Sequence, residues 1–446
     1  MQQKQKAMIQ TITVLLYGKP IGALRLLENG YCDFEYTDAF RASGLQPSPL
    51  MMPTDGRRVY SFPNLGRETF NGLPGMVADS LPDSFGQALL NQWLTLHSRD
   101  EGQANALEKL SFQGQRCMGA LEYQPARETY MDESTIIELD TMVETARQAL
   151  SSKEGFKACL EDKEQAILEI LKIGTSAGGQ RAKAVIALND TTNEIRSGQV
   201  PAPDGFDYWL LKFDGFDSNG HPVNPANYGR IEYAFSRCVQ DAGIEMKECR
   251  LIHENGRAHF MTKRFDRKNG QKIHMQTLCG LAHYDFQKPG AYSYEQVFRT
   301  MRLMNLDYVQ GEEMFRRMLF NILSVNMDDH TKNISFLMER NGIWRLSPAY
   351  DMGFSYNPNG QWASAHQLSI NGKRDNITNK DIFDVAFSQS IRHPEEILEQ
   401  VDEAVSHFEQ YALEEGVPTD EIKHITGIIK QKREPLFPSK IYPVRS

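Results

Sequence analysis

The amino-acid sequence predicts an α+β protein of two lobes, one rich in β-strands and one all-helical, preceded by a small α/β subdomain. Its 446 residues are too many for a single ordinary hydrophobic core. Strand-like segments separated by turn signals dominate the middle of the chain, and helical periodicity dominates its last third. Because the pattern breaks near residue 130, we expect divisions at 1–130, 131–266 and 267–446.

Composition narrows the class of protein. Hydrophobic content of 40% and charged content of 24% are ordinary for a globular domain. A net charge of −9 argues against broad non-specific binding of nucleic acid. No apolar run is long enough to cross a membrane, and the first residues lack the apolar core of a signal peptide, so we expect a cytoplasmic protein without membrane contact. The six scattered cysteines contain no Cys-x-x-Cys pair and are expected to be reduced.

The first segment predicts an antiparallel meander. Alternating apolar residues mark strands at 12–16, 21–27 and 31–36, and Glu28-Asn-Gly30 is a strong hairpin signal. Further on, Asp79 and Asp83 could form an acid pair. The favoured interpretation is that they are loop and cap carboxylates at the ends of short helices.

The middle segment opens with two helical stretches, 134–151 and 162–173, and then a glycine-rich loop at 174–183. Glycine lets backbone N–H groups approach phosphate oxygens closely, and two cations add positive charge, although Gly-Gly loops are often plain turns. An apolar strand at 184–188 follows. The residues expected to contact phosphate are Gly178, Gly179, Gln180, Arg181 and Lys183.

Lys212 lies inside the apolar strand predicted at 208–213. It is either a snorkelling edge lysine or a lysine held on a strand to bind nucleotide phosphates. Glu232, expected in the first turn of a helix at 230–239, suits the helix dipole and could also pair with Lys212. A hairpin around Glu254-Asn-Gly256 follows. This order of elements is that of a protein-kinase N-lobe, with a hinge expected after Phe265.

A polar loop, Ser324–Asn333, stands between an apolar helical run at 314–323 and a strand-like run at 334–338. Asp328 and Asn333 are five residues apart, the spacing of the kinase loop H-R-D-x-x-x-x-N, in which Asp accepts the substrate proton and Asn binds metal. Asp329 is the competing carboxylate, and the spacing favours Asp328. Lys332 could steady the transferred phosphoryl group. His330 is either a support of this kind or a structural hydrogen-bonding residue.

Asp351-Met-Gly353 lies eighteen residues beyond Asn333 and looks like the metal-binding Asp-Phe-Gly turn of kinases. The oxygens of an Asn and an Asp at adjacent strand ends suit Mg²⁺. The predicted helices of the last segment lie at 292–304, 312–323, 381–386, 394–415 and 419–433.

These motifs closely resemble those of the HipA family of bacterial serine/threonine protein kinases, the toxins of type II toxin–antitoxin pairs. The resemblance covers essentially the whole chain. Its motifs are 72–83 in the N-terminal subdomain, the hinge-like Thr262-Lys-Arg-Phe-Asp-Arg267, the catalytic-loop-like 326–333, and Pro348-Ala-Tyr-Asp351. It implies ATP and Mg²⁺ as cofactors, Asp328 as the base, Asn333 and Asp351 as metal ligands, and Lys212 in ATP binding. Hinge contacts through Lys263 and Phe265, and a nucleotide contact by Tyr350, are implied as well.

The family also implies regulation and partners. Its members autophosphorylate a serine seven residues before the lysine that ends the glycine-rich loop, which here is Ser176, with Thr175 as the competing site. A phosphoserine would bring about −1.5 to −2 charge into the ATP-phosphate pocket. Ala177 and Ala182 stand where proline is frequent in the family. The implied partner is a HipB-like helix-turn-helix antitoxin, with DNA reached only through that complex. The implied substrate is a protein, such as an aminoacyl-tRNA synthetase or another translation factor.

Two other functions fit parts of the sequence. A small-molecule kinase of the aminoglycoside or choline type would share the Asp-to-Asn loop, but it would not need the N-terminal 130 residues or Ser176. A non-catalytic subunit of a DNA-bound repressor complex would not need Asp328, Asn333, Asp351 and Lys212 together.

Overall fold

The computed structural model describes residues 9–82, 86–87, 90, 104–126, 134, 136–143, 182–215 and 227–437. Contacts along the chain divide it into two compact units. Unit 1 comprises Met1–Gly229, Glu248–Asp285 and Ser335–Trp344, and unit 2 comprises Arg230–Lys247, Phe286–Ile334 and Arg345–Ser446. This grouping differs from the sequence-based division, because residues 230–247 group with the helical unit and residues 335–344 group with the β-rich one.

The first sheet of unit 1 is the predicted meander, extended at both edges. Its strand order is β4-β3-β2-β1-β5, and every neighbouring pair is antiparallel. Gly22 must be glycine, because a Cβ there would lie 2.4 Å from the carbonyl oxygen of Glu35 on the next strand. The strands are β1 (Thr11–Leu16), β2 (Lys19–Leu26), β3 (Cys32–Tyr36), β4 (Val59–Tyr60) and β5 (Leu121–Gln124).

Short helices accompany this sheet. Asp79, which directly follows one of them, accepts hydrogen bonds from the backbone N–H and the hydroxyl of Thr277, both at 2.8 Å. Thr277 is in turn the N-cap residue of α9. Asp79 is therefore a structural carboxylate at helix ends, as the favoured interpretation held, whereas Asp83 lies outside the described residues. The helices are α1 (Asp38–Arg41), α2 (Arg67–Phe70), α3 (Gly75–Ala78), α5 (Ala106–Gln113) and α9 (Leu278–Ala282).

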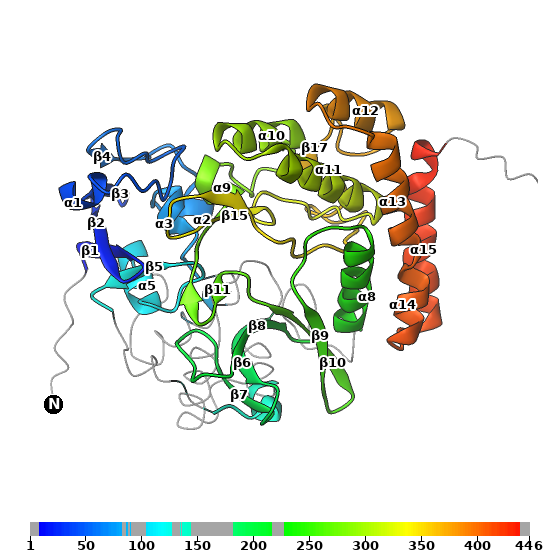
Figure 1. Cartoon of the computed structure of the whole chain (residues 1–446), viewed down its shortest axis with the longest axis horizontal. Coiled ribbons are helices and arrows are strands. Elements are labelled where there is room, and N and C mark those ends of the chain that lie inside the picture. Colours follow the sequence, from blue (N-terminus) through cyan, green and yellow to red (C-terminus); the bar gives the residue numbers. More distant parts are fainter. Residues whose placement is uncertain are drawn as a thin grey trace, which may run out of the picture. The chain divides into compact units, whose positions relative to one another are not determined.

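The second sheet of unit 1 is antiparallel, in the order β7-β6-β8-β10-β9 (Figure 1). Trp209 and Leu211 of the central strand are fully buried and pack in one apolar cluster with Ile186 and Met261. The near-continuous apolar runs of the sequence are explained by this burial. The strands are β6 (Lys183–Asn189), β7 (Glu194–Ser197), β8 (Asp207–Lys212), β9 (Cys249–Glu254) and β10 (Arg257–Lys263).

Residues after 266 are mostly helical but also contain strands, among them the strand-like run expected at 334–338. A two-stranded hairpin and a small antiparallel sheet lie there, because the run after the polar loop finds backbone partners in the segment after the hinge: Thr277 pairs with Ser335 and His274 with Met338. The strands are β11 (Arg267–Lys268), β12 (Gln271–Lys272), β13 (His274–Thr277), β15 (Ser335–Met338) and β16 (Trp344–Leu346).

Unit 2 is mainly helical, with α11 in contact with α10, α13 and α15 (Figure 1). Unit 2 also contains the parallel pair β14 (Tyr292–Ser293) and β17 (Leu368–Ser369). The helix predicted over 394–415 is two helices that meet at His407. The helices are α8 (Tyr228–Asp241), α10 (Tyr294–Leu303), α11 (Tyr308–Leu323), α12 (Asn379–Ser388), α13 (Pro394–Ser406), α14 (Phe408–Glu414), α15 (Thr419–Arg433) and the 3₁₀ turn η3 (Glu434–Leu436).

Two expectations from composition can be compared with the structure. None of the helices in the described ranges is both long and apolar enough to span a bilayer. Cys32, Cys117, Cys238, Cys249 and Cys279 are buried free thiols, as expected, while Cys159 lies outside the described part of the chain.

Candidate active site

Helix α11 ends in a strained turn that delivers the polar loop. The backbone N–H of Asn326 donates to the carbonyl of Asn321 at 2.9 Å, and that of Val325 donates to Ile322 at 3.3 Å. These two bonds are those of a Schellman motif, in which a left-handed residue, usually glycine, follows the helix. Here that residue is Val325, with φ 57° and no exposed surface. A β-branched residue in this conformation costs about 1–3 kcal/mol, so the surrounding packing holds the turn.

The loop itself is closed by its own hydrogen bonds. The Nδ2 of Asn333 donates to the backbone oxygen of Asp328 at 2.8 Å. The backbone N–H of His330 also donates to that oxygen, and the N–H of Asn333 donates to the carbonyl of His330, both at 2.9 Å. With its Nδ2 used in this way, the Asn333 amide presents Oδ1 as the atom that could bind a metal. The two residues selected by spacing are thus joined directly.

Asp329 has a different role from its neighbour. It is 2% exposed, and its Oδ2 accepts hydrogen bonds from the Tyr294 hydroxyl at 2.9 Å and from His366 Nδ1 at 3.0 Å. Its Oδ1 accepts the backbone N–H of Gln367 at 2.7 Å. Three donors from two other segments therefore surround this carboxylate. Asp328, by contrast, is partly exposed.

The second motif lies beside the loop. Asp351 adopts a left-handed backbone with φ 52°. Its carbonyl oxygen accepts a hydrogen bond from Asn326 Nδ2 at 3.2 Å. Farther along, Ser355 forms a parallel bridge with Asn326, and its carbonyl accepts the N–H of Met327 at 2.8 Å. The Asp-Met-Gly turn is therefore fixed to the segment that precedes Asp328.

Asn333 and Asp351 line the same small pocket of unit 2, together with His330 and Tyr350. The Tyr350 hydroxyl donates to the carbonyl of Lys332 at 2.7 Å, which braces the loop from the other side. One carboxylate and one amide suit a hard cation that keeps waters and takes further oxygens from a phosphate. Within the described ranges no group of three or more His, Cys, Asp and Glu side chains could hold a metal, so these two residues would hold Mg²⁺ only with such additional ligands.

Two supporting residues of the loop share one aromatic neighbour. The Lys332 ammonium lies 4.5 Å from the centroid of the Phe286 ring, and the His330 ring lies 5.4 Å from it. His330 Nδ1 is buried, with no hydrogen-bond partner among the described residues. Phe286 thus restrains both side chains, and a phosphoryl contact by Lys332 would have to compete with this cation–π interaction.

In unit 1 the structure brings two predicted phosphate-binding lysines together. Lys183 on β6 and Lys212 on β8 are directly opposed in the antiparallel register, so their side chains share one face of the sheet. They are 3% and 9% exposed, and Lys212 Nζ lies 5.6 Å from the ring of Phe260, its partner on β10. Because β8 is the central strand, Lys212 is not a snorkelling edge lysine.

The predicted hinge follows β10. Lys263 ends the strand, and its Nζ pairs with Asp207 Oδ2 at 2.6 Å. The backbone N–H of Lys263 donates to the backbone carbonyl of Glu248 at 2.9 Å, and that of Arg264 donates to the backbone carbonyl of Tyr208 at 2.8 Å. Phe265 comes next and is half-buried. The hinge backbone is therefore held by sheet hydrogen bonds up to Arg264.

Other predicted residues are not joined to these groups. Glu232 lies on α8, which begins at Tyr228; it stands beyond the first turn rather than in it, because the helix starts two residues earlier than expected. Lys212 and Glu232 belong to different units, and their pairing stays a prediction. Residues 174–181 of the glycine-rich loop lie outside the described residues, and with them the predicted positions Thr175, Ser176, Gly178, Gly179, Gln180 and Arg181.

Sequence reasoning did not identify Tyr294, His366 and Gln367 as partners of Asp329. They lie 35, 37 and 38 residues away along the chain, and no local pattern links them. Reasoning from sequence also overlooked Arg264, Asp266 and Arg267 as a buried charge cluster. Here a signal existed, since three charges directly follow an apolar strand and precede another strand.

Comparison with known proteins gives two family matches. The model of the HipA-like C-terminal domain matches residues 175–409, and that of the HipA N-terminal domain matches residues 12–124. A Haemophilus influenzae protein provisionally named a kinase is 29% identical over 165 residues. That alignment covers 32% of this chain and 48% of the relative, so the chain spans about half the length of this curated protein.

Among solved structures, HipA of Shewanella oneidensis MR-1, determined in a complex with HipB and operator DNA, aligns with a TM-score of 0.63. The alignment covers 96% of this chain and 97% of that one at 16% identity. At this identity the match establishes the fold, which is the kinase-like α+β arrangement expected from the order of elements.

Proposed function

The chain belongs to the HipA family, and we propose that it is an ATP- and Mg²⁺-dependent serine/threonine protein kinase, the toxin of a toxin–antitoxin pair. One observation carries this proposal most directly: Asn333 and Asp351 line one pocket of unit 2, and Asn333 is hydrogen-bonded to the backbone of Asp328. A proton acceptor and two oxygen ligands for a hard cation, held on linked turns, are what phosphoryl transfer to a hydroxyl requires.

In the proposed reaction the oxygen of the acceptor hydroxyl attacks the γ-phosphorus of ATP, and ADP leaves. Asp328 accepts the proton of that hydroxyl. Mg²⁺ at Asn333 and Asp351 would neutralise charge on the phosphates. Asn326 and Asp329 keep the loop in place through the hydrogen bonds described above. Tyr350 supports the same loop through its bond to the Lys332 carbonyl.

The remaining predicted contacts concern nucleotide binding. Lys183 and Lys212 would contact phosphate oxygens, and their placement on one face of the second sheet supports this. The glycine-rich residues at 178–181 would cradle the phosphates with backbone N–H groups. Adenine would meet backbone groups at Lys263 and Phe265. Glu232 would orient Lys212 by pairing with it.

Control of the kinase is proposed at Ser176. Phosphorylation there would place negative charge where the ATP phosphates bind and would inhibit the enzyme. We further propose a HipB-like helix-turn-helix antitoxin as partner, since the S. oneidensis protein is found in such a complex with operator DNA. The substrate would be a protein hydroxyl, with aminoacyl-tRNA synthetases and other translation factors as the first candidates.

The test is incubation of the purified chain with γ-³²P-ATP and Mg²⁺, followed by mass spectrometry of the labelled peptide. We expect label in the wild-type protein, at Ser176. The Asp328→Ala variant should lose about 10²–10⁴-fold in rate, which is the usual contribution of a positioned base. Asp384→Asn, which changes an exposed carboxylate of the same unit, is the matched control and should label normally. Equal labelling of wild type and Asp328→Ala would reject the kinase assignment, whereas label at Thr175 would reject only Ser176 as the regulatory site.

A further inference from the structure

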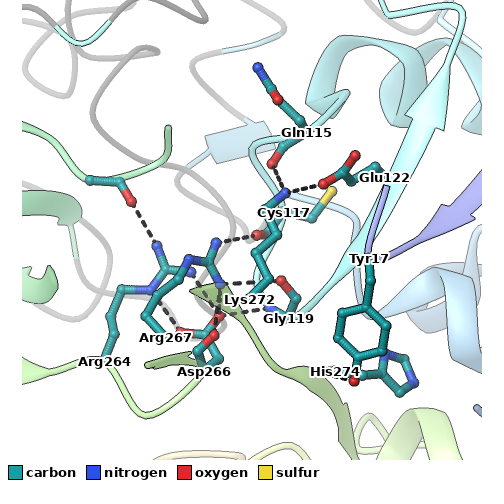
Figure 2. Close-up of polar contacts among 11 residues, drawn as sticks. Tyr17, Gln115, Cys117, Gly119, Glu122, Arg264, Asp266, Arg267, Lys272 and His274 are labelled. Carbon is teal, nitrogen blue, oxygen red and sulfur yellow. Dashed lines mark hydrogen bonds and ion pairs between the residues drawn. The ribbon is translucent and has the colours of Figure 1, made fainter. Parts of the chain in front are cut away.

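Three charged residues directly after β10 are buried. The side chains of Arg264, Asp266 and Arg267 are 1%, 0% and 5% exposed. They form the cluster in the lower left of Figure 2, which we call the hinge cluster. Buried charges of this kind are costly unless each is paired and hydrogen-bonded, so their presence in a short connecting segment needs a reason.

One carboxylate holds both guanidinium groups. Arg264 binds Asp266 in bidentate fashion, with Nε to Oδ1 and Nη2 to Oδ2, both at 2.8 Å. Arg267 Nη1 reaches the same Oδ2 at 2.8 Å. Burial and the neighbouring Arg264 charge lower the pKa of Arg267 to about 10, so it stays protonated at neutral pH. The hinge cluster therefore carries a fixed geometry and a fixed charge state.

The hinge cluster also binds the N-terminal domain. The backbone N–H of Gly119 donates to Asp266 Oδ2 at 2.7 Å. Arg267 donates to the carbonyls of Gly119 at 3.2 Å and Cys117 at 3.3 Å. Gly119 has φ +72°, a left-handed conformation that favours glycine, and a Cβ there would lie 3.0 Å from the backbone N of Met275, a tight contact. The turn at 117–119 is thus bound through its backbone.

A third cation, Lys272, extends the attachment to Gln115 and Glu122. Lys272 Nζ donates to the carbonyl of Gln115 at 2.5 Å and pairs with Glu122 Oε1 at 2.8 Å (Figure 2). On the opposite side, Arg264 Nη1 donates to the carbonyl of Gly198, the residue after β7, at 3.0 Å, while within the segment the N–H of Ile273 donates to the carbonyl of Asp266 at 2.9 Å. Residues 264–273 are consequently held from both directions, by the second sheet and by residues 115–122 of the N-terminal domain.

We propose that Asp266 and Arg267 are positioning residues through which the N-terminal domain sets the backbone of the hinge at Lys263–Phe265, and with it the adenine-binding geometry. This inference rests on the proposed kinase function. Stability alone does not explain the hinge cluster, because apolar residues of similar volume often stabilise a fold as well as or better than a buried ion pair. What charged, bidentate contacts add is directional precision in the segment between Lys263 and Arg267.

The experiment compares binding of ADP with binding of inorganic tripolyphosphate to the full-length chain by calorimetry. An adenine contact affects only the first ligand, whereas both report on the phosphate site. The variants are Arg267→Met, which removes the bonds to residues 117 and 119, and Arg267→Lys, which keeps the charge. Leu24→Ala is the matched control, because it destabilises the N-terminal sheet by loss of a fully buried side chain and leaves the hinge cluster intact.

We expect Arg267→Met to weaken ADP binding about tenfold, the effect of misplacing one hydrogen bond, with tripolyphosphate binding unchanged. Arg267→Lys should lie between Arg267→Met and wild type, and Leu24→Ala should bind both ligands as wild type does. All measurements are made at a temperature where far-ultraviolet circular dichroism shows a folded chain. If Arg267→Met does not fold, Arg267→Lys alone is compared with wild type.

Three results would overturn the inference: unchanged ADP binding in a folded Arg267 variant, equal weakening of both ligands, or the same loss of ADP binding in Leu24→Ala. A wild-type chain that binds no ADP would instead reject the proposed function, and the inference with it. The two failures are therefore distinguished by the wild-type measurement.

Discussion

Two buried aspartates, Asp266 in unit 1 and Asp329 in unit 2, hold functional segments in different ways. Asp266 is surrounded by two guanidinium groups and one backbone N–H. Asp329 is surrounded by a phenol, an imidazole and a backbone N–H. Asp266 fixes a connection between two domains of unit 1, whereas Asp329 fixes a loop inside unit 2. The comparison indicates that charge pairing is used where backbone segments must be joined across a domain boundary.

The energetic consequences differ accordingly. Removal of the Asp266 charge would leave two guanidinium groups buried and uncompensated, which is among the largest penalties for a single substitution. Removal of the Asp329 charge would mismatch the hydrogen bonds that its carboxylate makes with a phenol, an imidazole and a backbone N–H, which costs less. Four predictions test this difference, in decreasing order of expected effect.

Asp266→Asn should lower the free energy of unfolding by about 3–5 kcal/mol, because Arg264 and Arg267 would lose the carboxylate that compensates them. Urea denaturation of the two proteins measures the difference. Glu35→Gln, which removes an exposed partner of Arg58, is the control and should leave the midpoint unchanged. An Asp266→Asn midpoint equal to that of wild type would remove the basis for the comparison.

Acid should destabilise unit 1 through histidines rather than through Asp266. Burial lowers the pKa of His274 to about 4 from an ordinary value of 6.5. As the pH falls, the His274 imidazole is therefore protonated in the unfolded chain before it is protonated in the folded one. The free energy of unfolding has its full value above pH 6.5 and falls by about 3 kcal/mol as the pH falls to 4. The arginines hold the pKa of Asp266 below its ordinary value of 3.8, and because that ordinary value itself lies below this interval, the contribution of Asp266 changes little between pH 6.5 and 4.

The measurement is the urea midpoint at pH 7 and at pH 4.5 for wild type and His274→Gln. The glutamine amide can replace the ring N–H that lies 2.9 Å from the carbonyl of Pro47, without titrating. We expect the variant to show a flatter pH dependence. A dependence as steep as that of wild type would assign the acid sensitivity to other groups, such as His283, whose pKa is also lowered to about 4 by burial.

Asp329→Asn should lower the free energy of unfolding by about 1–3 kcal/mol. Its amide N–H₂ would face groups that now donate hydrogen bonds to a carboxylate oxygen. The phosphoryl-transfer rate should fall with little change in ADP affinity, since the substitution displaces the loop of Asp328 and leaves the hinge cluster intact. Steady-state kinetics with calorimetry separate the two. A loss of ADP affinity equal to that of Arg267→Met would erase the distinction between the two aspartates.

Tyr294→Phe should have the smallest effect and lower the free energy of unfolding by about 1 kcal/mol. The variant loses the hydroxyl that donates to Asp329 and accepts from Asn321 at 3.0 Å, while the ring keeps its packing. A double-mutant cycle with Asp329→Asn should show coupling between the two positions. Additive effects would mean that the hydroxyl does not support the loop through Asp329.

Part of this molecule could be predicted from sequence because the signals are local. Alternation, turn residues and helix caps placed most strands of the two main sheets, although not β4, β5 and β7, and ended the last helix at Arg433, as observed. The fixed spacing of Asp328 and Asn333 was enough to select them, because a loop of six residues closes on itself through short-range bonds. The helix at 394–415 was the failure of this approach: its periodicity continues through His407 although the chain changes helix there.

The sequence by itself determined the order of elements, the family and the residues proposed for catalysis, since each depends on patterns within a few tens of residues. Only the tertiary structure decided which aspartate of the Asp-Asp pair is enclosed, that Lys183 and Lys212 share one face, and that Asp266 binds Gly119 of another domain. These facts depend on pairings between segments tens to more than a hundred residues apart. Backbone register and close packing fix such pairings, and neither leaves a periodic trace in a single sequence.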